Sequence, residues 1–233
     1  MTITELIFFV LLSTGPGLFI SWWIYKKDKH APEPHLHLAI SFILGMVIIL
    51  PAYILETAGS SVINVSKDPI ETLIYSMFII ALTEEGLKFS VLRLYNYTNN
   101  DFDEPMDGIV YAVMISMGFA TLENIMYVNS YGLQVGLLRM FTAIPAHAAF
   151  AVLMGYYAGK AKFAPKNKRT LLLVTGLSFA VLSHGLYDFF LLQQNFPLLV
   201  YVAFIVLIVS IIIAMLWIAS HAEESRQSQL PEN

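Results

Sequence analysis

The sequence predicts an all-α membrane protein, a polytopic bundle of about seven or eight transmembrane helices that encloses a polar cavity within the membrane. Composition and the length of the apolar runs carry this prediction. Hydrophobic residues make up 57% of the 233 residues and charged residues only 13%, whereas an ordinary soluble domain carries about 25% charged residues. The apolar residues also gather into runs of the roughly 20 residues that a helix needs to cross a bilayer.

This composition excludes several classes of protein. A soluble globular chain of this size would need more polar side chains to cover its surface, and a disordered chain would be less apolar. A nucleic-acid-binding protein would need a basic surface, whereas the formal net charge is −4. The absence of cysteine excludes disulfides, thiolate metal sites and a cysteine nucleophile.

Seven apolar runs are expected to form one membrane domain that covers residues 1–233. The first run lacks a basic leader and a small-residue cleavage site, so it is expected to remain as a span and not to be removed as a signal peptide. Only a short polar turn at 193–197 separates the last two runs. The expected spans are 3–24, 37–57, 70–94, 107–130, 135–158, 171–193 and 196–220, followed by a cytoplasmic tail at 221–233.

The Lys and Arg residues set the expected orientation, because loops rich in them stay on the cytoplasmic side. They cluster at 26–29, after the first run, and at 160–169, after the fifth, which fall on the same side of a seven-span bundle. Lys67 and Arg139 fall on the other side. The protein is therefore expected as a multi-pass protein of the cytoplasmic membrane, surrounded by the lipid bilayer, with its N-terminus outside and its C-terminus in the cytoplasm.

Four of the runs contain ionisable or amide side chains. An ionisable group at the bilayer centre costs roughly 2.5–3.5 kcal/mol, so it marks a candidate functional site. The helical rise of about 1.5 Å per residue places these groups in one band between the outer leaflet and the midplane, which predicts a shared cavity. They are Glu84, Glu85 and Lys88 in the third run, Glu123 and Asn124 in the fourth, His147 in the fifth, and His184 and Asp188 in the sixth.

Each of these groups alone also has a structural interpretation. Residues four apart share a helix face, so Glu84 with Lys88 and His184 with Asp188 fit buried neutralised pairs. Glu123 fits a polar contact between helices, and a lone His147 fits a hydrogen bond to a carbonyl oxygen. A structural role for every member of a set at one depth is much less expected.

The same residues are compatible with three kinds of chemistry. Two carboxylates and two imidazoles with an amide can activate water and stabilise an oxyanion. Glu and His also bind a zinc ion that keeps one position open for water, and a transporter would use them as a proton relay. The HExxH and GxSxG motifs are absent, and spacing alone does not separate the three.

Three motifs carry a resemblance to a known family. EEGLK at 84–88 fits the pattern EExxK, FATLENIMY at 119–127 fits FxxxExxxY, and HGLYD at 184–188 fits HxxxD. In this order and on successive runs, they resemble the PrsW-type intramembrane proteases, relatives of the CAAX-processing and bacteriocin-processing glutamate proteases. The stretches APEPH and FDEPMDGIVY are also similar to that family.

The resemblance implies a peptidase of the cytoplasmic membrane that makes the first, site-1 type cut in regulated proteolysis during a stress response. Its expected substrate is a single-span membrane protein, an anti-sigma factor cut near its outer face, and a further intramembrane protease is expected to process the product. By this resemblance Glu84 and Glu85 form the catalytic pair. The remaining motif positions are Glu123, His184 and Asp188, and His147 joins them by its depth.

The mechanism expected from these residues needs no cofactor. Glu84 or Glu85 deprotonates a water that attacks the peptide carbonyl, while His184 and Asn124 stabilise the oxyanion. Asp188 orients His184, and Lys88 keeps one glutamate ionised.

Two alternatives to this mechanism remain open. The first is a zinc-dependent protease with Glu85, Glu123, His147 and His184 as ligands. The second is a non-enzymatic membrane sensor or proton-coupled transporter.

An acidic segment lies before the fourth run, at Asp101, Asp103, Glu104 and Asp107. Such a segment either binds a cation or is simply solvated. The sequence alone favours solvation, because runs of like charge usually face water.

Overall fold

The computed structural model describes residues 3–29, 31–63, 65 and 68–228. Lys67 and the end of the expected tail, 229–233, lie outside these residues. The described part contains helices and loops and no β-strand, which confirms the all-α bundle. The helices are α1 (Ile3–Lys27), α2 (His35–Val47), α3 (Ile49–Ser60), α4 (Pro69–Ile74), α5 (Leu82–Val91), α6 (Pro105–Tyr131), α7 (Leu133–Phe141), α8 (Ala143–Phe163), α9 (Lys166–Leu192) and α10 (Val200–Ser228).

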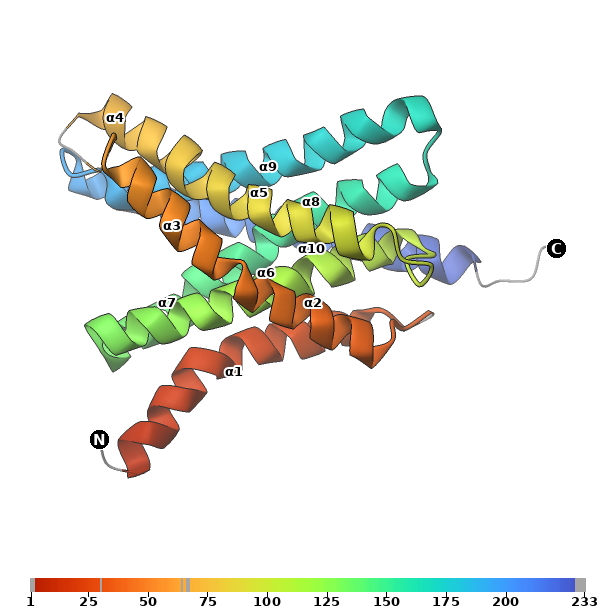
Figure 1. Ribbon diagram of the computed structural model, residues 1–233, viewed down its shortest axis with the longest axis horizontal. Helices are drawn as coiled ribbons and strands as arrows, with labels where there is room; N and C mark the ends of the chain where they lie inside the picture. Colours follow the sequence, from red (N-terminus) through yellow and green to blue (C-terminus); the bar gives the residue numbers. More distant parts are fainter. Residues whose placement is uncertain (1–2, 30, 64, 66–67, 229–233) are drawn as a thin grey trace.

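Several of these helices join into longer runs that lie roughly side by side (Figure 1). Within the described residues, six runs are long and apolar enough to cross a membrane by length and composition: 3–27, 35–60, 105–131, 133–163, 166–192 and 197–227. A further helical run, from α4 to Asn96, lies among them and carries Glu84, Glu85 and Lys88.

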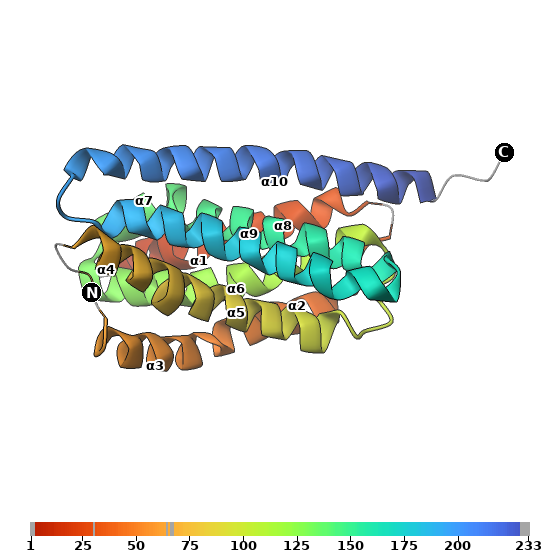
Figure 2. The ribbon, with the colours of Figure 1, turned by 90° about the horizontal axis from the view of Figure 1, so that it is seen from above.

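Successive runs alternate in direction, so the loops gather at two ends of the bundle (Figures 1 and 2). The chain between α1 and α2, the loop before α6 and the turn between α8 and α9 lie near the C-terminus, at what we call the C-terminal end. The loop before α4, the turn at Gly132 and the turn after α9 lie at the opposite, N-terminal end.

Helix α6 forms the centre of the bundle, and most of its residues from Met106 to Thr121 are buried. Glycines allow its neighbours to approach closely. A Cβ atom built on Gly155 of α8 would lie 2.3 Å from the carbonyl oxygen of Gly108, and one on Gly118 would lie 1.9 Å from that of Phe42 in α2. Close backbone approach at small residues is a common way for membrane helices to pack.

Two π-helical turns interrupt the run that carries the glutamates. They are η1 (Tyr75–Ala81) and η2 (Leu92–Asn96), and they flank α5 on both sides. A π turn holds an extra residue and so changes the face that the following residues present, and such turns are frequent at functional sites.

The last helix differs from the expectation, because α10 continues through the predicted tail to Ser228. His221 stacks on Tyr156 of α8 with ring centroids 4.3 Å apart, and Ser225 is buried against the start of α6. These contacts with α8 and α6 explain why residues 221–228 remain helical although the sequence there is polar.

Candidate functional site

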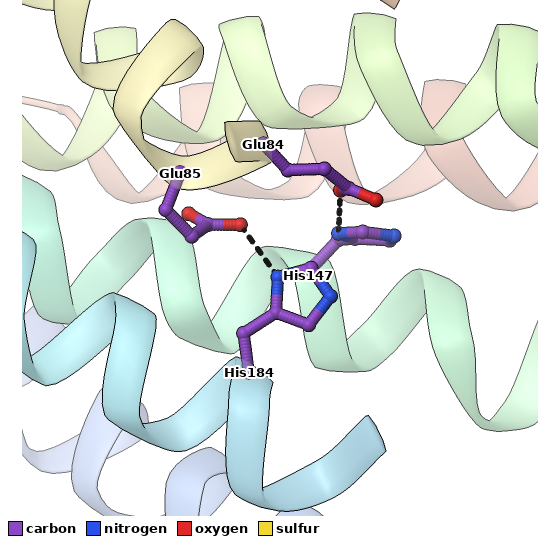
Figure 3. Close-up of side chains that lie close together, drawn as sticks. All are labelled: Glu84, Glu85, His147 and His184. Atoms are coloured by element: carbon purple, nitrogen blue, oxygen red, sulfur yellow. Dashed lines mark hydrogen bonds and ion pairs between the residues drawn. The ribbon is translucent and has the colours of Figure 1, made fainter. Parts of the chain in front are cut away.

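Four side chains from three helices converge where α5, α8 and α9 meet (Figure 3). Glu84 and Glu85 lie on α5, His147 on α8 and His184 on α9, and all four are buried. Each contributes one carboxylate oxygen or imidazole nitrogen, and these four atoms lie within 4.8 Å of one another. The structure thus brings together residues that the sequence placed on separate runs.

Lys88 connects the two glutamates. It follows Glu85 by three residues and Glu84 by four, and both spacings place side chains on one helix face. Its Nζ donates to Glu85 Oε1 at 2.7 Å and to Glu84 Oε2 at 3.0 Å, and lies 3.2 Å from Nδ1 of His147. Lys88 is only 2% exposed, so its charge and those of the glutamates depend on one another for compensation.

Each imidazole is held by a carboxylate at its Nε2 atom. Nε2 of His147 lies 3.0 Å from Glu123 Oε2, and Nε2 of His184 lies 3.3 Å from Asp188 Oδ2. A carboxylate at one nitrogen fixes both the orientation of the ring and the position of its proton. The Nδ1 atom of His184 is thereby directed at Glu85, and the Nδ1 atom of His147 is directed at Lys88.

The two Nδ1 atoms meet different partners. His147 Nδ1 faces the Lys88 ammonium, so a neutral ring that accepts there and donates from Nε2 satisfies both contacts. His184 Nδ1 lies 3.0 Å from Glu85 Oε1, so both nitrogens of this ring face carboxylates, an arrangement that a doubly protonated ring satisfies. The two rings therefore differ in their surroundings, because one nitrogen of His147 faces an ammonium whereas both nitrogens of His184 face carboxylates.

Asn124 does not join this cluster, although the sequence suggested it as an oxyanion donor. Its Nδ2 donates to the carbonyl oxygen of Leu12 at 2.9 Å, and its Oδ1 accepts from Nε of Arg139 at 3.1 Å. The amide is thus used to attach α1 and to hold an arginine. Asn124 lies next to Glu123 in sequence, and the turn of about 100° per residue directs Asn124 toward α1 and Glu123 toward His147 of α8, although both side chains also contact Arg139.

Arg139 also belongs to the site. From the sequence it was expected only as a positive charge on the side of the membrane opposite the basic loops. Its Nη2 donates to Glu123 Oε2 at 2.6 Å, and its guanidinium lies 3.9 Å from the centroid of the Tyr127 ring. The chain turns at Gly132, so α7 folds back and returns this arginine to α6. The available signal was a lone cation near the start of the expected 135–158 span.

A cavity of about 500 Å³ extends from the cluster toward the N-terminal end of the bundle, where Val65 and Leu192 line it. Glu84 borders this cavity, whereas Glu85, which is 1% exposed, lies behind it against Lys88. Besides Glu84, the acidic, basic and histidine side chains that line the cavity belong to Glu56, Glu123, Arg139, His147, His184 and Asp188.

Glu56, like Arg139, lies at the site but was not among the site residues expected from the sequence. It lies on α3 and borders both the main cavity and an adjoining one of about 270 Å³, which also reaches Glu84 and Glu123. Its buried Oε1 has no hydrogen-bond partner in the described part of the chain. The signal was an acid near the end of an otherwise apolar run.

The convergent atoms form a donor set that suits a metal ion, and they belong to Glu84, Glu85, His147 and His184. Zinc sites use such carboxylates and imidazoles, and a metal-binding His commonly donates its other N–H to a carboxylate. Both rings have that second carboxylate here. Glu123, which the zinc alternative counted as a ligand, instead holds the far nitrogen of His147. The donor set therefore fits a metal ion, and the Lys88 ammonium contacts three of the four residues, Glu84, Glu85 and His147.

Comparisons with known proteins agree with these features. A protein-family model described as PrsW family intramembrane metalloprotease matches residues 33–216. Among curated relatives, Protease PrsW of Geobacillus kaustophilus is 36% identical over 189 residues, which cover 80% of this chain and 82% of the relative. Protease PrsW of Oceanobacillus iheyensis is 39% identical over 201 residues, which cover 85% and 90%. No solved structure matches the chain.

The family is described as metalloproteases, so the expectation that the mechanism needs no cofactor is not confirmed. The matched residues include both glutamates, both histidines and every helix that borders the cavity except parts of α10. The chain belongs to the PrsW family of intramembrane proteases and is a peptidase.

Proposed function

We propose that this peptidase makes the site-1 type cut in a single-span membrane protein, an anti-sigma factor, near the outer face of the cytoplasmic membrane. The observation that carries the proposal is the position of Glu84, His147 and His184 on a cavity that extends to the N-terminal end of the bundle. A further intramembrane protease then processes the product.

The distribution of charge supports the orientation in this proposal. The basic segments at 26–29 and 160–169 lie at the C-terminal end of the bundle, and loops of this kind remain in the cytoplasm. The N-terminal end, toward which the cavity extends, then faces outward. A substrate helix that unwinds near the outer leaflet would present its peptide bond to the cavity.

We assign the general base to Glu84, because it borders the cavity while Glu85 does not. Glu84 takes a proton from a water, and the resulting hydroxide forms a C–O bond with the peptide carbonyl carbon. The His184 ring, which Glu85 and Asp188 hold from both sides, stabilises the negative charge on the carbonyl oxygen electrostatically. The C–N bond then breaks as the leaving amine takes the proton from Glu84.

The other residues position these groups. Glu85 holds Lys88 and one side of His184, and Asp188 holds the other side. Glu123 and Arg139 together hold His147. A metal ion held by Glu85, His147 and His184 would supply Lewis-acid polarisation of the carbonyl and a more acidic bound water.

The experiment is cleavage of candidate single-span proteins by the full chain in lipid vesicles. We expect Glu84→Gln and His184→Asn to abolish cleavage, while Glu223→Gln, which changes an exposed acid at the end of α10, leaves it unchanged. If cleavage persists in both site variants, these residues are not catalytic.

Elemental analysis of the same preparations separates the two forms of the mechanism. A metal-dependent site should contain about one metal ion per chain, and His147→Ala should lose it. If the active wild-type protein contains no stoichiometric metal and chelators leave cleavage intact, the metal-free mechanism applies.

A further inference from the structure

A second group of acids is buried at the C-terminal end of the bundle, far from the cavity. Asp28 and Glu33 lie in the connection between α1 and α2, and Glu104 and Asp107 lie at the start of α6. All four are at most 5% exposed. Glu104 and Asp107 are thus enclosed by protein, in contrast to the solvation that the sequence favoured.

Three of these acids meet at one point. Asp28, Glu104 and Asp107 each offer one carboxylate oxygen, and the three oxygens lie within 4.8 Å of one another. Glu33 joins them because its N–H donates to Asp28 Oδ2 at 3.3 Å, and its own carboxylate accepts from the hydroxyl of Tyr111. We call these four residues the acidic cluster.

Local hydrogen bonds leave part of the acidic cluster unsatisfied. Asp107 Oδ2 caps α6 by accepting from the N–H groups of Asp103 at 2.8 Å and Glu104 at 2.7 Å. Oδ1 of Asp28 and Oδ1 of Asp107, however, are buried and accept from no N–H or hydroxyl donor among the described residues. The side-chain neighbours of these two acids are other carboxyl groups, Glu104 beside Asp28 and Glu33 beside Asp107. Asp107 itself is 0% exposed, and an unpaired carboxylate oxygen in such a place is costly.

No positive side chain compensates the acidic cluster within the described residues, where no Lys, Arg or His forms an ion pair with any of the four acids. Lys162, a basic residue whose charge interacts with Asp107, donates instead to the carbonyl oxygens of Tyr97 and Asn99.

We propose that the acidic cluster binds one hard divalent cation of the Mg²⁺ or Ca²⁺ type. Its donors are all oxygens, which these ions prefer, whereas zinc sites usually include nitrogen or sulfur. The unpaired Oδ1 atoms of Asp28 and Asp107 are the vacant acceptors that the cation takes up. The Tyr111 hydroxyl and the Ser225 hydroxyl, which donates to Glu104, hold the surrounding carboxylates in place.

Such a cation would connect three parts of the chain at the C-terminal end. It would join the α1–α2 connection to the start of α6, and Ser225 extends the contact to the end of α10. A ligand that binds only the folded state raises stability with its concentration. The site is therefore structural, and its occupancy is measurable through unfolding instead of through cleavage.

The test uses the purified full chain in detergent, treated with EDTA, dialysed and then titrated with MgCl₂ or CaCl₂ in separate arms. Calorimetric titration should show one saturable site for at least one of the two ions. At 100 times Kd, the thermal unfolding midpoint should rise by roughly 5–10 °C.

Three variants locate the effect. Asp28→Asn should abolish most of the midpoint shift, while Asp103→Asn, which changes an exposed acid of the same segment, should retain it. Glu85→Gln should also retain it, which separates the acidic cluster from the catalytic cavity. Glu104→Gln serves as the second cluster variant if Asp28→Asn folds poorly.

Two results would overturn the proposal. One is the absence of saturable binding of both ions to the wild-type chain. The other is a midpoint shift that persists in both cluster variants or disappears in Glu85→Gln.

Discussion

The catalytic cavity and the acidic cluster lie near opposite ends of α6. They differ in how their buried charges are compensated. In the cavity, Lys88 and Arg139 bind the glutamates directly, so the site balances most of its own charge. The acidic cluster has no such partner in the described chain and two vacant carboxylate oxygens. A cavity that balances its own charge suits a peptide substrate that binds and is released, whereas the uncompensated acidic cluster suits a cation that remains bound.

The strongest test of this comparison is the removal of the general base. We expect Glu84→Gln to lower kcat by roughly 10²- to 10⁴-fold, the usual contribution of a positioned acid–base group. The unfolding midpoint should change little, because the amide oxygen can still accept from Lys88. Initial rates in vesicles and thermal unfolding in detergent measure the two effects, and retention of near-normal kcat would contradict the assignment.

The second test removes the cation that balances the cavity. Lys88→Met should destabilise the protein by about 3–5 kcal/mol, because two buried carboxylates lose their partner. The matched control is Arg226→Met, since Arg226 forms an exposed i,i+3 pair with Glu223, and an exposed pair of this kind contributes little to stability. Equal losses of stability in the two variants would mean that the buried ion pairs of Lys88 contribute no more to the free energy of unfolding than the exposed pair of Arg226.

The third test examines the packing that holds both regions at a fixed separation. Gly155→Ala places a methyl group 2.3 Å from the carbonyl oxygen of Gly108, and overpacking of this kind costs about 1–3 kcal/mol. Gly86→Ala is the control, because a Cβ atom there meets nothing within 4 Å and alanine favours the helix. Thermal unfolding of both variants should show a loss only for the first.

The smallest effect is expected at the edge of the cavity. Glu56→Gln keeps the shape of a side chain whose Oε1 has no partner among the described residues, so the fold should be unaffected. We expect a change of a few-fold in KM with little change in kcat, because Glu56 borders the cavity without contacting Lys88 or either histidine. A large loss of kcat would instead place Glu56 among the catalytic residues.

The sequence predicted those features that depend on local spacing. The EEGLK and HGLYD motifs fixed the pairs Glu84–Lys88 and His184–Asp188, because residues four apart always share a helix face. The common depth then brought His147 into the set, since it depends only on the rise per residue along each run.

Features that depend on which helix lies opposite could not be predicted in the same way. The side chain of Asn124 meets α1, which has no motif that would reveal the contact. Arg139 reaches Glu123 only because the chain folds back at Gly132. Glu104 is buried partly because α10 extends to it, and the polar sequence of the C-terminal segment did not indicate this contact.

The central position of α6 also limits how the chain can change in length. Asp107 and Glu123 lie on this helix about 24 Å apart along its axis, at 1.5 Å per residue. One inserted residue between them would turn one carboxylate by about 100° relative to the other, and the glycine contacts on both sides leave no room for the helix to adjust. Homologous chains are therefore expected to tolerate insertions in the loops at either end, but to keep the number of residues between these two acids constant.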